Sequence, residues 1–273
     1  MKFILAGCVR NCESYIDNVF KNIEKICHTI HVEKIVIAYD ISHDKTLLEL
    51  IKQKKRLSTD IEILINKNAL SPHRTQNISN ARNKLLHYIY NYPTIIDKFI
   101  MMDFDDVCAQ PINIDVFKQS LLLDADCITF NNKNYYDFWA LSLDNYQFSA
   151  WHLNKPHKYL KAARNYLLEK FSDTQNEYIE CDSAFNGFGI YNVASFKNCS
   201  YQAYMDHTYY DKNKLDFIKK TLQVNINIHM PPYDCEHRLY HLQAKQKNTA
   251  RLIIYKKFLF PEYSGPHTNF IKC

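Results

Sequence analysis

Three aspartates follow a short apolar run near the middle of the chain. The apolar residues 99–102 lead directly to Asp103, Asp105 and Asp106. In extended backbone, side chains two residues apart point to the same side, so we expect Asp103 and Asp105 to face one ion. Carboxylates this close repel one another, and a hard divalent cation relieves the repulsion while leaving positions for phosphate oxygens. The cluster therefore predicts a Mn²⁺ or Mg²⁺ site, with an acidic turn in solvent as the alternative.

Two arginines and a scarce glycine add to this pattern. Arg74 and Arg82 are expected at a loop and a helix start, where guanidinium groups and helix N-termini favour diphosphate oxygens. The chain has only four glycines, and one of them forms Asn186-Gly187 shortly after Asp182. A chain this sparing of glycine keeps it where backbone geometry or close ligand approach requires it. Asn186 and Gly187 are therefore candidate binding residues.

Alternating strand and helix signals in the first 130 residues place these side chains. The expected strands cover residues 3–9, 34–39, 61–65 and 98–102, and the expected helices cover 12–30, 46–55 and 79–90, the last opened by a serine cap. Such alternation predicts right-handed crossovers and a parallel sheet covered on both faces. Ligands bind beyond the carboxyl ends of the strands in such sheets, and Arg10, Asp40 and Asp103 all fall there.

The second half of the chain has a different pattern. Strands are expected at residues 126–131, 138–143 and 251–259, helices at 158–171 and 234–247, and a mixed segment at 180–193. The fold class is therefore α/β, a Rossmann-like, mostly parallel sheet flanked by helices, with an α+β second half. We expect one domain over residues 1–273, whose two halves meet near residue 130.

Composition narrows the classes of protein. Hydrophobic residues make up 47% of the 273 residues and charged residues 23%, which excludes global disorder. The net charge of +5 includes no dense basic block, so no nucleic-acid partner is expected. No apolar run approaches the roughly 18 residues that span a bilayer, so no transmembrane segment is expected.

Cysteine usage indicates a compartment. The nine cysteines include no C-x-x-C pair, which favours reduced thiols in a cytoplasmic setting. The apolar start of the chain is interpreted as a first strand rather than a signal peptide, because charged residues follow without a cleavage site. Abundant Lys, Asn, Ile and Tyr indicate an AT-rich genome, viral or cellular.

The motifs resemble a known family. The chain resembles GT-A glycosyltransferases in its strand ending in acids, its upstream arginine helix and its later Asn-Gly segment. More narrowly, three motifs are similar to the cryptococcal capsule mannosyltransferases. They are Arg74…Ala81-Arg82-Asn83, Tyr136-Asp137-Phe138-Trp139-Ala140-Leu141 and Asp182-Ser183-Ala184-Phe185-Asn186-Gly187 followed by Phe196. The resemblance covers about residues 3–260. It implies a GT-A-like fold with a nucleotide-sugar-binding half to about residue 130 and an acceptor-binding half from about 131. It also implies metal-dependent transfer of a hexose from a nucleotide-diphosphate sugar to a hydroxyl group on a glycan or protein.

The chain departs from that family at the acidic cluster. The family usually has Asn-Asp-Val where this chain has Asp105-Asp106-Val107, which makes Asp106 the matching metal ligand. The spacing of Asp103 and Asp106 also resembles collagen hydroxylysine glycosyltransferases, whose pattern makes those two the ligands. Which two of the three aspartates bind the ion therefore stays open. The first likeness favours GDP-mannose as donor and the second a UDP-sugar.

A late histidine is a further ligand in many GT-A enzymes. His267, in Gly265-Pro266-His267, falls where such a residue is expected, after the last strand. Three other histidines compete for the role: His229, His237 and His241.

The catalytic base has several candidates. Glu236 opens a helix and resembles the acidic motif on the acceptor side of GT-A enzymes, while Asp182 and Glu180 precede the Asn-Gly turn. An inverting enzyme needs such a carboxylate to deprotonate the acceptor hydroxyl. In a retaining enzyme the leaving phosphate serves instead.

Four charged residues are expected to bind the nucleotide and the diphosphate. Arg10 and Asp40 would seat the base and ribose, and Arg74 and Arg82 the diphosphate. Five aromatic residues are candidates for stacking on sugar rings, although core packing is the expected role for most: Tyr135, Tyr136, Phe138, Trp139 and Trp151. A sugar nucleotidyltransferase normally has a glycine-rich loop after the first strand, which is absent here; a non-catalytic nucleotide- or sugar-binding module is the other alternative.

Overall fold

One mixed sheet organises the part of the chain that the structure describes. The structure is a computed structural model and describes residues 1–227 and 233–263. Within these residues the strands are β1 (Lys2–Val9), β2 (His31–Tyr39), β3 (Ile61–Ile65), β4 (Lys98–Met102), β5 (Cys127–Asn131), β6 (Tyr178–Cys181), β7 (Phe188–Asn192) and β8 (Leu252–Phe258). They form a single eight-stranded sheet in the order β3-β2-β1-β4-β7-β5-β8-β6.

The sheet is mostly parallel, as the sequence predicted. β1 to β4 run in one direction, and β5 and β8 are parallel to each other. β7 pairs antiparallel with both β4 and β5, and β6 pairs antiparallel with β8. Because two antiparallel steps restore the direction, β5 and β8 point the same way as β4. The α/β fold class is therefore confirmed.

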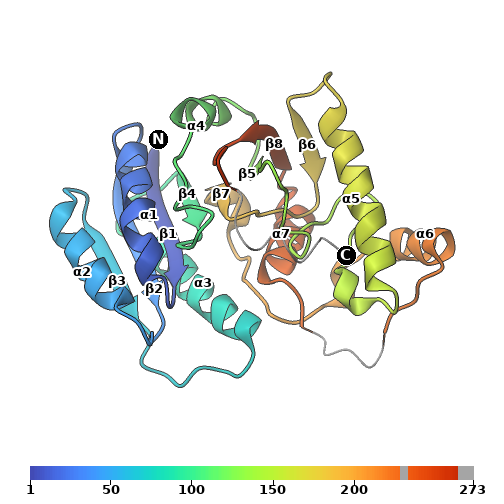
Figure 1. Ribbon diagram of the computed structural model, residues 1–273, viewed down its shortest axis with the longest axis horizontal. Helices are drawn as coiled ribbons and strands as arrows, with labels where there is room; N and C mark the ends of the chain where they lie inside the picture. Colours follow the sequence, from blue (N-terminus) through green and yellow to red (C-terminus); the bar gives the residue numbers. More distant parts are fainter. Residues whose placement is uncertain (228–232, 264–273) are drawn as a thin grey trace.

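Helices cover both faces of the sheet. They are α1 (Glu13–Cys27), α2 (Thr46–Arg56), α3 (Arg74–Tyr90), α4 (Ile114–Ser120), α5 (Pro156–Ser172), α6 (Lys212–Leu222) and α7 (Glu236–Asn248). Alternate residues of β1 enter two separate cores, Ile4 with residues of α3 and α7, and Leu5 with residues of α1 and α4. Figure 1 shows α1 and α2 at one end of the sheet and α5 and α6 at the other.

Two predicted elements differ in the structure. Residues 138–143 form turns and isolated bridges rather than a strand. The reason is Arg238, whose buried guanidinium donates to the carbonyls of Trp139 and Leu141, groups that a strand would use for pairing. The helix expected from residue 79 begins at Arg74, so Ser79 is a buried mid-helix residue and not a cap.

Two helices were not anticipated from the sequence. Both α4 and α6 begin at a side-chain cap, where Asn113 accepts from the Val116 amide and Asp211 from those of Asn213 and Lys214. Such caps satisfy amides left without partners at a helix start. Among the described helices, none combines the length and apolar character needed to cross a membrane.

Candidate functional site

A cavity of about 870 Å³ lies at the carboxyl ends of the parallel strands. Arg10, Asp40 and Asp103, which follow β1, β2 and β4, all line it. Asp40 is 8% exposed and accepts a hydrogen bond from Asn66 Nδ2 at 2.8 Å, whereas Arg10 is exposed and its Nε donates to the Ile41 carbonyl. The strand ends thus bring together three side chains that lie far apart in the sequence.

The acidic segment after β4 forms part of the cavity lining. Asp103 and Asp105 line the cavity, and Phe104 between them packs edge-on against Phe20 in the core. Gly7 of β1 makes this possible, because a Cβ there would collide with the Phe104 ring and lie 2.6 Å from the Met102 carbonyl oxygen. Phe104 therefore anchors the segment and leaves the two carboxylates beside the cavity.

Asp106 has a different position. Its side chain is 7% exposed, and Asp106 is not among the described residues that line the cavity. Of the three aspartates, Asp103 and Asp105 are therefore the two placed at the cavity, which corresponds to the two-residue spacing rather than the three-residue one.

Arg82 connects two acids across the cavity. Its Nη2 lies 2.9 Å from Asp103 Oδ1, and its Nη1 lies 3.4 Å from Glu236 Oε1. The side chain is 5% exposed, and its guanidinium carbon stands 4.6 Å from the centre of the Phe185 ring. This packing fixes the planar group, so α3 and the first residue of α7 are joined through one cation. Arg74, at the start of α3, also lines the cavity.

The two cavity aspartates are costly to ionise without a further cation. Burial raises the pKa of Asp103 above its usual value even though Arg82 acts in the opposite direction, and Asp105 adds repulsion. Burial and the neighbouring Asp106 raise the pKa of Asp105 to about 6. Arg82 compensates only part of the negative charge of the two carboxylates, and a hard divalent ion such as Mn²⁺ or Mg²⁺ would compensate the rest. Within the described residues, no group of three or more possible metal ligands is assembled.

Asp137 is a cavity residue that the sequence analysis quoted in a motif but gave no role. Its carboxylate accepts from the backbone amides of Ala140 and Asn186, at 3.1 and 3.2 Å. Burial raises its pKa, and these two hydrogen bonds act against the rise. In the sequence, Asp137 stands out only as the single charged residue in an aromatic segment, Tyr136-Asp137-Phe138-Trp139. Asp137 and Glu236 are thus two described acids of the cavity besides the Asp103 pair and Asp40.

The Asn186-Gly187 turn lies behind the cavity instead of lining it. Asn186 has φ 58° and Gly187 φ 89°, both left-handed. The Asn186 amide oxygen accepts from the backbone amides of Tyr136 and Asp137, and its nitrogen donates to the Phe130 carbonyl. The Gly187 carbonyl accepts from the Asp103 amide at 2.9 Å. The position predicts support for the acidic segment rather than direct contact with a nucleotide sugar.

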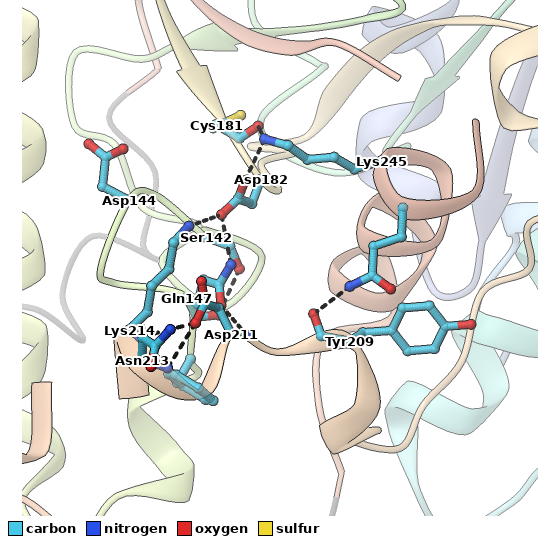
Figure 2. Close-up of polar contacts among 12 residues, drawn as sticks. Ser142, Asp144, Gln147, Cys181, Asp182, Tyr209, Asp211, Asn213, Lys214 and Lys245 are labelled. Carbon is cyan, nitrogen blue, oxygen red and sulfur yellow. Dashed lines mark hydrogen bonds and ion pairs between the residues drawn. The ribbon is translucent and has the colours of Figure 1, made fainter. Parts of the chain in front are cut away.

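Asp182 lies outside the cavity. Figure 2 shows its carboxylate between Lys214 and Lys245, with Gln147 Nε2 donating at 2.8 Å. Burial alone would raise its pKa, but these donors outweigh burial and the pKa lies below its usual value. A carboxylate held this way is a poor base, and Asp182 is not among the described residues that line the cavity, so the structure does not support it as the base. The exposed side chain of Glu180 pairs with Arg251 on the surface.

The histidine candidates divide into three cases. His267 and His229 lie outside the described residues. His241 is buried between Ser183 and Tyr191, and burial lowers its pKa to about 3, so it is neutral. His237 lines the cavity and stacks on the Phe185 ring at 3.7 Å, and burial holds its pKa well below the usual range.

No protein-family model matches the chain, and no curated protein matches it. Several solved structures are similar. Residues 1–349 of S. aureus TarS align with 99% of this chain and 63% of that chain, at 12% identity and a TM-score of 0.47. The same fragment in complex with UDP-GlcNAc aligns with 98% of this chain and 61% of that chain, at 14% identity and a TM-score of 0.45. Glucosyl-3-phosphoglycerate synthase from Mycobacterium tuberculosis, in complex with Mn²⁺, UDP and phosphoglyceric acid, aligns with 71% of this chain and 57% of that chain. The identity is 12% and the TM-score is 0.40.

This chain thus spans less than two thirds of the length of these similar structures. At identities of 12–14% and TM-scores below 0.5, these likenesses assign no activity to this chain. The resemblances to the cryptococcal and collagen enzymes stay predictions, because no family model matches.

Proposed function

We propose that this chain is a metal-dependent glycosyltransferase that moves a hexose from a UDP- or GDP-sugar to a hydroxyl group on a glycan or protein. One observation carries the proposal: an acidic pair, three arginines and Glu236 line a single cavity beyond the carboxyl ends of parallel strands. Convergent charged groups in a concave site at the carboxyl ends of parallel strands are what a diphosphate substrate requires.

The donor would lie over β1, β2 and β4. Asp40, which accepts a hydrogen bond from Asn66, would accept hydrogen bonds from ribose hydroxyls. Arg10 and Arg74 supply positive charge for the base and diphosphate, and Arg74 stands at a helix N-terminus, where anions are favoured. This arrangement supports residues to about 130 as the donor half of one domain.

The metal would be held by Asp103 and Asp105. A bound Mn²⁺ or Mg²⁺ supplies positive charge that stabilises the departing nucleoside diphosphate. The ion pair with Arg82 orients the Asp103 carboxylate, and the hydrogen bond from the Asp103 amide to the Gly187 carbonyl holds the backbone at Asp103.

Glu236 is the first candidate for the base of an inverting reaction. It lines the cavity at the start of α7, held through Arg82 at 3.4 Å. Asp137 is the second candidate, because both its oxygens already accept backbone hydrogen bonds and are less free to take a proton. In a retaining reaction neither residue would be needed as a base.

A thermal-shift and turnover experiment tests the proposal. UDP or GDP with Mn²⁺ should raise the melting temperature more than either component alone, because a ligand that binds the native state stabilises it. A panel of UDP- and GDP-sugars should show Mn²⁺-dependent hydrolysis that Asp103→Ala abolishes and Asp216→Ala, an exposed carboxylate on α6, preserves. Nucleotide binding without turnover would instead support a binding module. The absence of both nucleotide binding and turnover would refute the proposal.

A further inference from the structure

Both tryptophans of the chain line the same cavity. The sequence has two, Trp139 and Trp151. Trp151 lies in the short 3₁₀ helix Ala150–His152 and is 46% exposed. Large aromatic faces are normally covered in a folded protein, and one left accessible within a concave site is available to a ligand.

The described wall around the tryptophans is almost uncharged. Between residues 138 and 160 the described lining residues are Phe138, Trp139, Ser149, Ala150, Trp151, His157 and Leu160. His157 is the one titratable side chain among them. The donor side carries Arg10 and Arg74 instead, so the two parts of the cavity suit different chemistry. A phosphorylated or carboxylated acceptor would find no arginine or lysine among these wall residues.

Two polar atoms in this wall lack a hydrogen-bond partner among the described residues. They are Trp139 Nε1 and Ser149 Oγ. Buried polar groups are nearly always satisfied, so such exceptions need an explanation. Both atoms are buried, so a sugar hydroxyl, which both donates and accepts hydrogen bonds, would reach them only after the side chains move.

We infer that this wall is the acceptor subsite and that it takes a neutral sugar ring, stacked on Trp151. The electron-rich ring face attracts the weakly positive C–H groups of a pyranose, and burial of the apolar sugar face adds to the attraction. The cavity of about 870 Å³ is near the upper end for a single ligand, roughly 300–1,000 Å³, which leaves room beside a donor. The inference rests on the proposed function and narrows its acceptor to a glycan.

Tryptophan fluorescence tests the subsite without any turnover. Because both tryptophans line the cavity, emission excited at wavelengths that tyrosine does not absorb reports on this cavity. The protein would be titrated with mannobiose, cellobiose and chitobiose, with 3-phosphoglycerate and a serine-containing peptide as comparators, and binding confirmed by calorimetry. At least one disaccharide should give a saturable signal. Trp151→Ala should weaken its binding by about tenfold, Trp151→Phe less, in line with the energies of aromatic contacts.

Phe217→Ala is the matched control, because Phe217 is a 50% exposed aromatic residue on α6 that does not line the cavity. Its disaccharide affinity should equal that of the unmodified protein. If no disaccharide binds while a nucleotide with Mn²⁺ still raises the melting temperature, the subsite is refuted and the proposed function stands. If the nucleotide with Mn²⁺ also fails to raise the melting temperature, both the subsite and the proposed function are refuted. Binding of 3-phosphoglycerate or the peptide that Trp151→Ala abolishes would overturn the sugar assignment.

Discussion

At the scale of single residues, Arg82 determines how the acids of the cavity are arranged. Its planar guanidinium contacts Asp103 and Glu236 at once, while Phe185 supports it from one side. A lysine has one compact ammonium group and cannot address both carboxylates with fixed geometry. The same residue therefore orients a proposed metal ligand and a proposed base.

Arg82→Lys should lower metal-dependent turnover by about 10- to 100-fold, because both acids lose their common partner. Steady-state kinetics with the best donor would measure the loss. Arg56→Lys is the control, since Arg56 also joins two side chains, Glu24 and Gln53, but on the surface. Equal activity of the Arg82→Lys variant and the unmodified protein would contradict this role.

Glu236→Gln separates the base from the donor site. The amide keeps the shape but cannot take a proton, so transfer should fall by about 10² to 10⁴-fold in an inverting enzyme. The nucleotide-dependent rise in melting temperature should remain, because Glu236 lies on the proposed acceptor side. If Asp137→Asn has the large effect and Glu236→Gln a small one, the two roles must be exchanged.

Residues at strand ends could be predicted from the sequence, and residues in irregular segments could not. Arg10, Asp40 and Asp103 gather because the carboxyl ends of parallel strands share one edge. Asp137 lies in non-repetitive backbone, where no periodicity indicates direction. Asp182 follows β6, but β6 runs antiparallel to β8 and therefore ends at the opposite edge of the sheet, which the sequence does not reveal. The structure gives Asp137 to the cavity and Asp182 to a lysine pair, the reverse of the emphasis that sequence alone suggested.

At the scale of elements, one turn supports the acidic segment. Asn186 and Asp137 exchange side-chain to backbone hydrogen bonds, and the adjacent Gly187 carbonyl accepts from the Asp103 amide. The turn before β7 is therefore tied to the loop after β5 and to the end of β4. This explains a scarce glycine and a left-handed asparagine without any ligand contact.

Asn186→Gly should destabilise the protein by about 1–3 kcal/mol, because glycine tolerates the positive φ but leaves three backbone groups without their partner. Apparent Mn²⁺ affinity should weaken as well, as Asp103 loses its support. Urea unfolding and Mn²⁺ titration would measure the two effects. Asn198→Gly is the control, since Asn198 is exposed and also has a positive φ, 64°. A similar loss in both variants would attribute the effect to the backbone alone.

Elements formed by continuous apolar runs were predicted well, and elements shaped by distant side chains were not. Residues 61–65 and 98–102 are β3 and β4 as expected, because each run is short, apolar and bounded by polar residues. Residues 138–143 carry a similar pattern, yet Arg238 from α7 takes their carbonyls. A contact spanning about a hundred residues of sequence is outside the reach of local periodicity.

At the scale of the whole molecule, β7 unites the two halves of the chain. It lies between β4 and β5 and pairs antiparallel with both, so a strand from the second half completes the sheet of the first. The sequence indicated a change of character near residue 130 but not this insertion. The cavity is lined by residues of both halves, among them Arg74 from the first and Trp151 from the second.

The second half is itself held together by a buried charge. Asp182 follows β6 and receives Lys214 from α6, Lys245 from α7 and Gln147 from the loop after β5 (Figure 2). Asp182→Asn should lower the free energy of unfolding at pH 7 by about 1–3 kcal/mol, a moderate value because both lysines are partly exposed. Urea unfolding at neutral pH would measure it.

The loss should depend on pH in a defined direction. Since the pKa of Asp182 is lower in the folded protein than in the unfolded chain, its contribution is present above the unfolded value, about 3.9, and disappears as the pH falls through the folded value. The difference between Asp182→Asn and the unmodified protein should therefore be constant from pH 5 to 7, within about 0.5 kcal/mol, and shrink below about pH 4. Asp144→Asn, a half-exposed carboxylate near Lys170, should change stability little at any pH. A difference that persists undiminished in acid would show that Asp182 acts through packing and not through its charge.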